Sequence, residues 1–363
     1  METIRSDTYK WALKGDFDNN IVNHIRRKTN FPIPKDLYEL TATEVKIDAQ
    51  NKIDGFLSRD FLQHCYELNG VSVRTTKKGD LTVVSSGLGV PELSFDKDGF
   101  QRSGNLISPR ELSGTAVSIL GPKACRYNYG HWLIDGVARL DIIHQTISPK
   151  DIDYYLVPKL SYDFQIDTLK TLGIPREKIV EIDDEDSIHC EKIYFATDPR
   201  GESSQITGIW ILKFLNEALG SSALEAPPVS KRIYISRKDS SSRGIKNEDK
   251  IIPILEHHGF EPLTMADYPL KDKISIFRNA SHVIGMSGAG FINLAFSNKD
   301  TKLLEIFPSN FVNYFYYAIC AQLGIGYDYM VQKRRGLKSL ISMYHSSITV
   351  NTKELETKLK LLG

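Results

Sequence analysis

The sequence predicts an α/β protein whose C-terminal half contains a parallel sheet. Three observations carry this prediction: apolar strand-like segments alternate with helical segments, the connections are short, and two of the predicted strands end in basic or glycine-rich turns. Such alternation is typical of a parallel sheet with helices on both faces. Sheets of this kind bind ligands at the carboxyl ends of their strands.

The elements of this half follow from apolar periodicity and from helix start and stop residues. Asn247 precedes one predicted helix and Gly259 closes it. We expect strands at residues 232–236, 260–264, 282–285 and 302–306, and helices at residues 248–258, 270–279, 288–296 and 313–323. A last amphipathic helix is expected at residues 353–362, docked on a neighbouring lobe.

The N-terminal half is less regular. A polar helix is expected around residues 9–28, and residues 40–120 are strand-like and rich in turns, with a strand order that cannot be deduced. The expected strands lie at residues 44–47, 71–75, 81–85, 116–120, 153–157, 179–182 and 192–196, and the expected helices at residues 164–172 and 206–219.

A change of composition separates the two halves. Residues 221–228 (SSALEAPP) are small, polar and proline-paired, which is typical of a linker. We therefore predict one domain at residues 1–225, a second at residues 226–335 and a C-terminal tail at residues 336–363.

Composition narrows the class of protein. The chain has 363 residues, a formal charge of +1 and 41% hydrophobic residues, which indicates a globular protein without a broad nucleic-acid surface. No window approaches a membrane span and the N-terminus lacks an apolar signal core, so we expect a cytoplasmic protein and leave peripheral contact with the inner face of a membrane open. The cysteines are scattered without a CxxC pair, so no disulfide or metal framework is expected: Cys65, Cys125, Cys190 and Cys320.

One stretch, YNYGHWLID at residues 127–135, is the first candidate for chemistry. Asn128 is a good N-cap, and apolar residues recur at helical spacing from Trp132 onward. His131 and Asp135 are four residues apart, so they would share one face of the helix near its N-terminus. There the helix dipole favours a carboxylate, and an imidazole exchanges a proton near neutral pH.

Two acidic features also have purely structural interpretations. The stretch around His131 is equally compatible with a capped helix that carries a local His–Asp contact, with Asp135 also paired to Arg139 one turn on. The acidic run at residues 183–186 (DDED) resembles a DxD-type metal motif, but we interpret it as a solvated loop.

The predicted strand at residues 232–236 runs into a basic segment, RKDSSSRGIKNE. Arg237, Lys238 and Arg243, with three serines, lie between a strand and a helix N-terminus. Guanidinium groups, hydroxyls and free helix N–H groups together form a plausible cradle for a diphosphate. The alternative is a solvated basic loop.

A glycine-rich turn, GMSGAGFIN at residues 285–293, follows another predicted strand. Its glycines permit close backbone approach, so a phosphate or nucleotide could lie on the helix end, although tight strand–helix turns need glycine in any case. The candidate ligand residues are Ser287, Gly288, Ala289, Gly290 and Asn293. The next strand ends near Glu305, where a carboxylate could accept a hydrogen bond from a ribose.

The same turn resembles a nucleophile elbow, except that its last position is alanine instead of glycine. Asp328 and His345 follow later in the chain. A serine hydrolase that uses Ser287 is therefore an alternative, although Asp328 lacks a clear strand end before it.

Taken in order, these motifs resemble glycosyltransferase family 61 over roughly residues 115–310. The motifs are NYGHWLID, RIYISR with the later Arg243 and Asn247-Glu248, the GxxGAGxxN turn, and LEI at residues 304–306. The family includes bacterial capsular-polysaccharide-type transferases. The resemblance implies a GT-B-like fold of two Rossmann-type lobes around a central cleft, with residues 1–225 as the acceptor-side lobe and residues 226–335 as the nucleotide-sugar donor lobe.

The resemblance also implies a reaction: inverting transfer of a sugar from a nucleotide-diphosphate sugar, UDP-linked, to a hydroxyl of a glycan or lipid-linked glycan in surface polysaccharide synthesis. No cofactor and no obligate metal are implied. The basic segment and the glycine-rich turn would hold the diphosphate, and Glu305 the nucleoside. Family members commonly carry histidine where this chain has Ser287, which brings no charge. A non-catalytic nucleotide-sugar-binding protein is therefore a second hypothesis.

Inverting transfer needs a base for the acceptor hydroxyl and positive charge for the departing diphosphate. Because inverting transferases usually use a carboxylate, we predict Asp135 as the base, with His131 positioning the acceptor, and the opposite assignment stays open. The residues that flank His131 are assigned to the acceptor side: Asn128, Tyr129 and Trp132.

Overall fold

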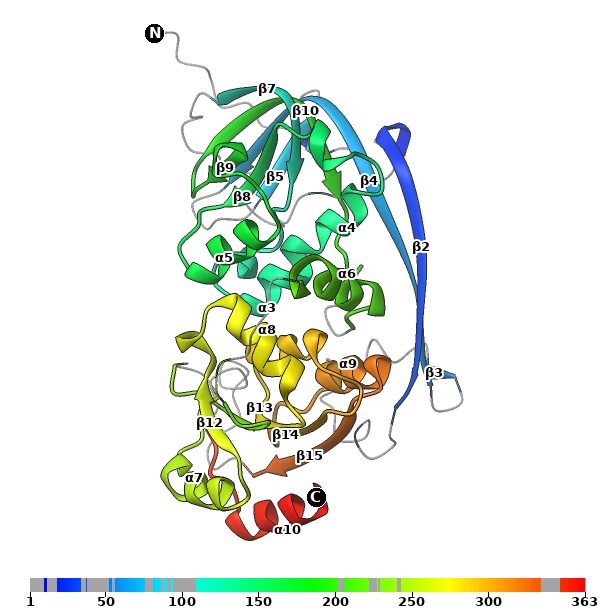
Figure 1. Ribbon diagram of the computed structural model, residues 1–363. Coiled ribbons are helices and arrows are strands. Elements are labelled where there is room, and N and C mark those ends of the chain that lie inside the picture. The colour runs from blue at the N-terminus through cyan, green and yellow to red at the C-terminus, as the bar shows by residue number, and fades with distance from the viewer. Residues whose placement is uncertain are drawn as a thin grey trace. The chain divides into compact units, whose positions relative to one another are not determined.

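The computed structural model divides into two compact units, Met1–Arg27 with Asp60–Glu202, and Lys28–Arg59 with Ser203–Gly363. Figure 1 shows the elements of each unit. The structure describes residues 10–11, 18–33, 37, 52–53, 56–75, 81–85, 88–89, 93, 109–201, 206–221, 227, 229–239, 243–333 and 347–362. Within these residues, no helix combines the length and the apolar composition that a membrane crossing requires.

The larger sheet is mixed and belongs mostly to the first unit, although residues 28–32, 52–53 and 56–59, which contribute to three of its strands, are part of the second unit. Its strand order is β1-β6-β5-β4-β10-β7-β8-β9, and β2 and β3 also pair with β4. The strands are β1 (Lys10–Trp11), β2 (Ile21–Pro32), β3 (Lys52–Ile53), β4 (Phe56–Thr75), β5 (Leu81–Ser85), β6 (Leu88–Gly89), β7 (Arg110–Ser118), β8 (Tyr154–Pro158), β9 (Ile179–Ile182) and β10 (Ser187–Ala196). β10, β7, β8 and β9 run parallel, whereas β4 is antiparallel to β10. The unit therefore has a parallel part extended by a long antiparallel strand, which departs from a plain Rossmann-type lobe.

The polar helix predicted around residues 9–28 is wrong, because residues 21–32 form strand β2. From residue 21 to residue 28, half-buried and exposed side chains alternate strictly. This period of two is the pattern of a strand with one covered face, and the many charged residues on its exposed face hid it. The strand expected at residues 44–47 lies outside the described residues.

The helices of the first unit follow its parallel strands. After β7 come η5 (Lys123–Arg126), α3 (Tyr129–His131), the π-helix η6 (Trp132–Val137), α4 (Arg139–Ile143) and η7 (Pro149–Asp151). After β8 come α5 (Asp163–Thr171) and η8 (Arg176–Lys178), and η1 (Asp18–Asn20) precedes β2. In Figure 1, α3, α4 and α5 gather at one end of this unit's sheet.

The second unit has a parallel sheet of five strands among its described residues, in the order β12-β11-β13-β14-β15. The strands are β11 (Arg232–Ser236), β12 (Glu261–Thr264), β13 (His282–Met286), β14 (Lys302–Pro308) and β15 (Gly326–Gln332). Numbered from β11, the order is 2-1-3-4-5, the doubly-wound arrangement whose ligand site lies between the first and third strands. The parallel sheet predicted from the sequence is confirmed.

Helices cover both faces of this sheet. Apolar side chains of α7 (Glu248–His257) and α10 (Thr352–Leu362) join the core with those of β13 and β14 on one face. On the other face, Phe291 of η10 (Ala289–Phe296) lies against Gly285. The remaining helices are α6 (Ile209–Gly220), η9 (Met265–Asp267), α8 (Leu270–Asn279) and α9 (Phe315–Leu323).

The predicted domain boundaries remain predictions. Helix α6 belongs to the second unit, ahead of the boundary expected at residue 225. Most of the predicted linker at residues 221–228 lies outside the described residues. The C-terminal helix α10 also belongs to the second unit, where it packs with α7.

Candidate functional site

Asn128 caps the helix that carries the first candidate residues. Its Oδ1 accepts a hydrogen bond of 3.2 Å from the backbone N–H of His131. The backbone oxygen of His131 also lies 3.3 Å from Sγ of the buried Cys125. The backbone on both sides of the imidazole is therefore fixed, as the capping prediction required.

The helix widens immediately after His131. Residues Trp132–Val137 form a π-helix, in which the N–H of Ala138 reaches the carbonyl of Leu133 at 3.0 Å. π-Helical turns are rare in proteins as a whole, and many of those that occur lie at functional sites. Here the π-helix holds Asp135, whose side chain is 0% exposed.

Asp135 is bound by two partners at once. Its Oδ2 lies 2.6 Å from Nδ1 of His131. Arg200 approaches it as a fork, with Nε 2.5 Å from Oδ1 and Nη2 2.7 Å from Oδ2. The predicted contact between His131 and Asp135 is thus present, and a guanidinium completes a cluster of three.

The pairing of Asp135 with Arg139 does not occur as expected. Nε of Arg139 donates to the backbone oxygen of Asp135 at 2.8 Å, and its Nη1 donates to the carbonyl of Ala196. Arg139 therefore stabilises the backbone of the π-helix, and the carboxylate pairs with Arg200 instead.

The electrostatics of the cluster favour an ionised Asp135. Burial alone would raise its pKa, but the charge of Arg200 and the hydrogen bonds from His131 and Arg200 hold the pKa below the usual value. Asp198 lies beside this pair, and burial together with the charge of Asp135 raises the pKa of Asp198. The backbone N–H of Arg200 donates to Asp198 Oδ1 at 2.9 Å.

The two members of the predicted pair differ in access to solvent. The side chain of His131 is 39% exposed, whereas that of Asp135 is fully buried. Because an ionised carboxylate accepts and cannot donate, Nδ1 of His131 is assigned as the protonated nitrogen, which leaves the lone pair on Nε2. In this geometry, the imidazole is the member of the pair that an incoming hydroxyl can reach.

The cluster is built from loops that follow neighbouring parallel strands. His131 and Asp135 come after β7, and Arg200 comes after β10, which pairs with β7. The carboxyl ends of such strands meet at one edge of the sheet, where ligands bind. Sequence analysis missed Arg200 and Asp198. The available signal was TDPRG at residues 197–201, directly after a predicted strand, but the neighbouring position of β10 and β7 could not be deduced.

The other residues assigned to the acceptor side have different positions. Asn128 and Tyr129 are half-buried, and the ring of Tyr129 packs edge-to-face on Phe164 with centroids 5.5 Å apart. Trp132 is 0% exposed. The structure places Trp132 in the core of the first unit, and its assignment to the acceptor side stays a prediction.

A second candidate site lies at the carboxyl ends of β11 and β13 in the second unit, at the switch point of the 2-1-3-4-5 sheet. Arg237 follows β11, and Ser287 and Gly288 follow β13. A Cβ on Gly288 would lie 1.7 Å from Nη1 of Arg237. Glycine at this position therefore leaves the space that the guanidinium occupies.

Arg243 approaches the same turn. Its Nε donates to the backbone oxygen of Ser287 at 3.2 Å, and its guanidinium lies 5.1 Å above the ring of Phe311. Arg243 has a φ of 53°, a conformation that is uncommon outside glycine. Burial and the charge of Arg243 lower the pKa of Arg237. Two like charges are thus held close together at the switch point.

The remaining donor-side candidates divide into exposed and structural residues. Lys238 is exposed, and Ala289 and Gly290 are half-buried at the start of η10. Asn293 is fully buried, and its Nδ2 donates to the carbonyl of Gly290 at 2.8 Å, which stabilises the turn. Residues 240–242, the three serines of the basic segment, lie outside the described residues.

Glu305 lies inside the second unit. Its side chain is 0% exposed, and Tyr327 donates to its Oε2 at 2.9 Å. Burial raises its pKa to about 8, against smaller lowering effects from hydrogen bonds of Ser287 and Tyr327 and from the charge of Arg243. Its other oxygen, Oε1, has no hydrogen-bond partner within the described part of the chain. Glu305 is therefore a buried residue of the second unit, and its predicted contact with the nucleoside stays a prediction.

The acidic run forms the turn between β9 and β10, as the loop interpretation predicted. Asp183 lies 2.5 Å from Lys159, Asp186 lies 2.6 Å from Arg110, and Asp184 pairs with Arg126. Over the ranges that the structure describes, His, Cys, Asp and Glu side chains form no group of three that could hold a metal ion.

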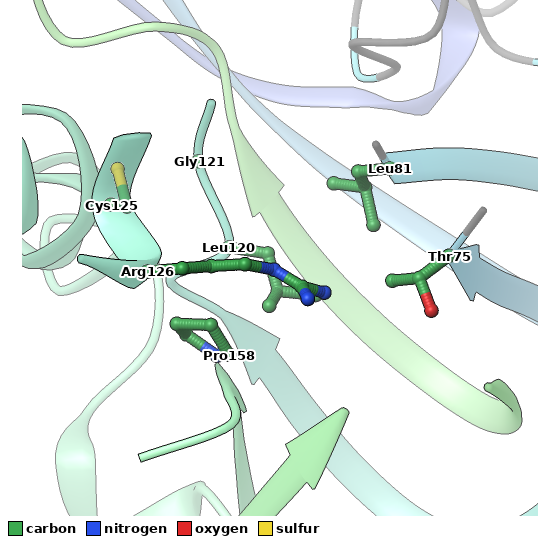
Figure 2. A pocket seen from close by; sticks show the side chains of 7 residues that line it. All are labelled: Thr75, Leu81, Leu120, Gly121, Cys125, Arg126 and Pro158. Atoms are coloured by element: carbon green, nitrogen blue, oxygen red, sulfur yellow. The ribbon is translucent and has the colours of Figure 1, made fainter. Parts of the chain in front are cut away.

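A small pocket lies beside η5 in the first unit. It is lined by Thr75, Leu81, Leu120, Gly121, Cys125, Arg126 and Pro158. Figure 2 shows the Arg126 side chain extending across it toward Thr75 and Leu81. The charge of Arg126 is already paired with Asp184, so this pocket gives little support to an anion site.

The first candidate site holds an imidazole–carboxylate pair, and the second holds a basic, glycine-containing turn at a switch point. Residues 129–304 match the model of the family described as Glycosyltransferase 61. The chain belongs to this glycosyltransferase family, and the match includes both His131 and the Ser287–Gly290 turn. No curated protein matches the chain.

Proposed function

We propose that this glycosyltransferase transfers a sugar with inversion from a UDP-linked donor to a hydroxyl of a glycan or lipid-linked glycan, in the cytoplasm and for surface polysaccharide synthesis. The observation that carries the proposal is the asymmetric pair in which buried Asp135 is bound by Arg200 and half-exposed His131. The GT-B-like arrangement around a cleft is part of the proposal, since the chemistry needs the donor diphosphate and the acceptor base to meet.

His131 acts as the base in this proposal, which reverses the assignment preferred from the sequence. Asp135 is fully buried and doubly bound, so an acceptor hydroxyl has no direct route to its oxygens. Nε2 of His131 takes the proton of the acceptor hydroxyl as its oxygen attacks the anomeric carbon of the donor. Asp135 orients the ring through Nδ1 and stabilises the imidazolium that forms.

The leaving group requires positive charge at the other site. Arg237, the guanidinium of Arg243 and the N–H groups at the start of η10 are suited to the diphosphate that departs with the nucleoside. These groups balance the developing charge without a metal ion, which supports a metal-independent mechanism.

The serine hydrolase alternative receives no support from the geometry. Ser287 is 3% exposed, and the titratable side chain that it influences is the carboxyl of Glu305, which is not the imidazole base that a serine hydrolase uses. Asp328 forms an ion pair with Lys358 at 2.6 Å, and His345 lies outside the described residues. The non-catalytic alternative leaves the ordered His131–Asp135–Arg200 cluster without a role.

The test uses His131→Asn in the full-length protein. An asparagine amide reproduces the Nδ1 hydrogen bond to Asp135 and removes Nε2. Release of UDP is measured with a panel of UDP-sugars and candidate glycan acceptors, with and without EDTA. We expect turnover to fall by about 10²–10⁴-fold, the usual contribution of general acid–base catalysis, with unchanged UDP affinity and no effect of EDTA.

His24→Asn, the same change on strand β2, is the matched control and should keep parental turnover. A folded His131→Asn protein with near-parental turnover would show that His131 is not the base. A parental protein that binds UDP-sugars but never turns over would favour the non-catalytic hypothesis.

A further inference from the structure

The segment that precedes His131 and the start of α5 carry exposed aromatic and aliphatic side chains. Tyr127 is 55% exposed and Tyr162 is 45% exposed, and Ile166 on the adjacent turn of α5 is 51% exposed. These three are among the few large apolar side chains that the described residues leave open to solvent. Exposed apolar patches of this kind mark sites of interaction.

The aromatic rings form a continuous row that starts two residues before His131. The ring of Tyr129 packs edge-to-face on Phe164 at 5.5 Å, and Phe164 stacks on Tyr162 at 5.4 Å with an angle of 15° between the rings. Tyr162 is the outermost member, with one face on Phe164 and almost half of its surface open. It therefore presents a flat apolar face with a hydroxyl at its edge.

The row is held firmly in place relative to His131. Gln165 is fully buried, and its Oε1 accepts hydrogen bonds from the N–H groups of Ser161 and Tyr162 at 2.9 and 3.1 Å. Its Nε2 donates to the backbone oxygen of Arg126, in η5, at 3.3 Å. One amide thus ties the start of α5 to the segment that leads into Tyr129 and His131.

The position of the row in the fold also points to a ligand. Tyr162 follows strand β8, and the segment with His131 follows β7, its parallel neighbour. Both therefore lie at the carboxyl edge of the parallel part of the sheet, where open α/β sheets bind ligands. Ligand sites combine flat aromatic surfaces with a few polar groups, and here those polar groups are the Tyr162 hydroxyl and His131.

We propose that Tyr162, backed by Phe164, is an aromatic platform that stacks on the apolar face of a pyranose ring of the acceptor glycan and so guides the acceptor toward His131. The identity of this glycan as the acceptor rests on the proposed function, whereas the binding of a sugar at the platform does not. A carbohydrate fits better than a lipid surface, because the row consists of aromatic rings, two of which carry hydroxyls, and Ile166 is the exposed aliphatic side chain one turn along α5.

The binding test measures saturation transfer by NMR from the full-length protein to methyl β-D-glucopyranoside, with sorbitol as the acyclic control. We expect transfer to the ring protons of the glycoside and little to sorbitol. Tyr162→Ala should reduce the transfer at least about fivefold, and Tyr162→Phe should largely retain it, since the ring is what stacks. Leu62→Ala removes an equally exposed apolar side chain elsewhere in the unit and should change nothing.

Kinetics separate this role from catalysis. With a working acceptor, Tyr162→Ala should raise the acceptor KM by about tenfold and leave kcat and the donor KM near parental values, as loss of uniform binding does. His131→Asn should lower turnover by about 10²–10⁴-fold and retain most of the glycoside contact, because the ring of Tyr162 is the surface that stacks. The two hypotheses can therefore fail separately. If His131→Asn keeps its turnover, the proposed base is wrong and the platform is unaffected. If Tyr162→Ala keeps its glycoside contact, the platform is wrong and the proposed base is unaffected.

Two results would overturn the platform. One is parental glycoside contact in a folded Tyr162→Ala protein. The other is that Tyr162→Ala and Ile166→Ala abolish binding of the protein to phosphatidylglycerol vesicles while glycoside contact stays intact. That result would mean that the row is a membrane-contact surface. Melting temperatures close to parental in all variants confirm that folding is preserved.

Discussion

Asp135 in the first unit and Glu305 in the second are both 0% exposed, yet their pKa values shift in opposite directions. Burial pushes both pKa values upward, because a low-dielectric surrounding disfavours charge. Asp135 receives a two-point ion pair from Arg200 and a bond from His131, and stays ionised. Glu305 receives a hydrogen bond from the neutral hydroxyl of Tyr327, and burial outweighs this bond and the charge of Arg243, so its pKa rises to about 8.

The difference shows that partners, and not burial, decide what a buried carboxylate can do. An ionised Asp135 can orient an imidazole and stabilise its protonated form, which is the role proposed for it. A protonated Glu305 adds no negative charge beneath a turn that is expected to hold a diphosphate. Each unit therefore keeps the charge state that its proposed chemistry needs.

The largest effect on stability is expected from removing Arg200, the cation that keeps Asp135 ionised while Glu305 stays protonated. Arg200→Met keeps a long side chain and leaves Asp135 buried without its cation. We expect a loss of about 3–5 kcal/mol in the free energy of unfolding, the usual cost of breaking a buried ion pair from one side. Urea denaturation at pH 7 measures this loss.

Arg26→Met on the exposed face of β2 is the matched control, with an expected effect within about 0.5 kcal/mol. Because the pKa of Asp135 is lowered in the folded protein, its contribution is present above the unfolded pKa and is lost as the pH falls through the folded pKa. An Arg200→Met protein as stable as the parent would mean that Asp135 does not depend on the ion pair.

Glu305→Gln tests the opposite case. A carboxyl whose folded pKa is raised binds its proton more tightly in the folded state, so its stabilising effect is complete at low pH and declines as the pH rises toward about 8. Between pH 6 and pH 9 the parental second unit should lose about 3 kcal/mol of stability through this residue. Glu305→Gln should remove that loss.

Hydrogen exchange of the amides of β13 and β14 reports the stability of the second unit by itself. Glu217→Gln, at an exposed position of α6, is the control and should keep the parental pH dependence. If Glu305→Gln and the parent show the same decline between pH 6 and pH 9, Glu305 is ionised at neutral pH and the contrast with Asp135 disappears.

The sequence was sufficient where local periodicity determines structure. Helix α8 and strand β11 have the predicted bounds, and the spacing of His131 and Asp135 was enough to predict their contact. Arg200 was out of reach, because its contact with Asp135 spans 65 positions and depends on β10 lying beside β7. Strand β15 was missed because its polar and aromatic residues lack a continuous apolar run.

The switch point in the second unit was predicted in part. Strand–helix alternation placed the basic segment and the glycine-rich turn at the same edge of one sheet, but the adjacency of β11 and β13 came from the structure. The fit of Arg237 into the space left by Gly288 is a contact between side chain and backbone that spacing alone cannot indicate.

The position of Arg237 in the space left by Gly288 leads to the smallest expected effect, which is a loss of affinity for UDP. Arg237→Ala should weaken binding of UDP by about 1.5–3 kcal/mol, the range for hydrogen bonds to charged groups, as measured by isothermal titration calorimetry. Lys238→Ala removes a neighbouring exposed charge and should cost less than about 1 kcal/mol. His131→Asn, in the other unit, should leave UDP affinity unchanged.

Gly288→Ala tests the same site without removing any charge. Its Cβ would lie 1.7 Å from Nη1 of Arg237, so the guanidinium must move, and we expect a loss of UDP affinity similar to that of Arg237→Ala. Gly244→Ala is the matched control, because its Cβ would meet only the Oγ of Ser347, at 3.5 Å, which is an ordinary contact. If Gly288→Ala binds UDP as tightly as Gly244→Ala does, the position of Arg237 at the turn is not what holds the diphosphate.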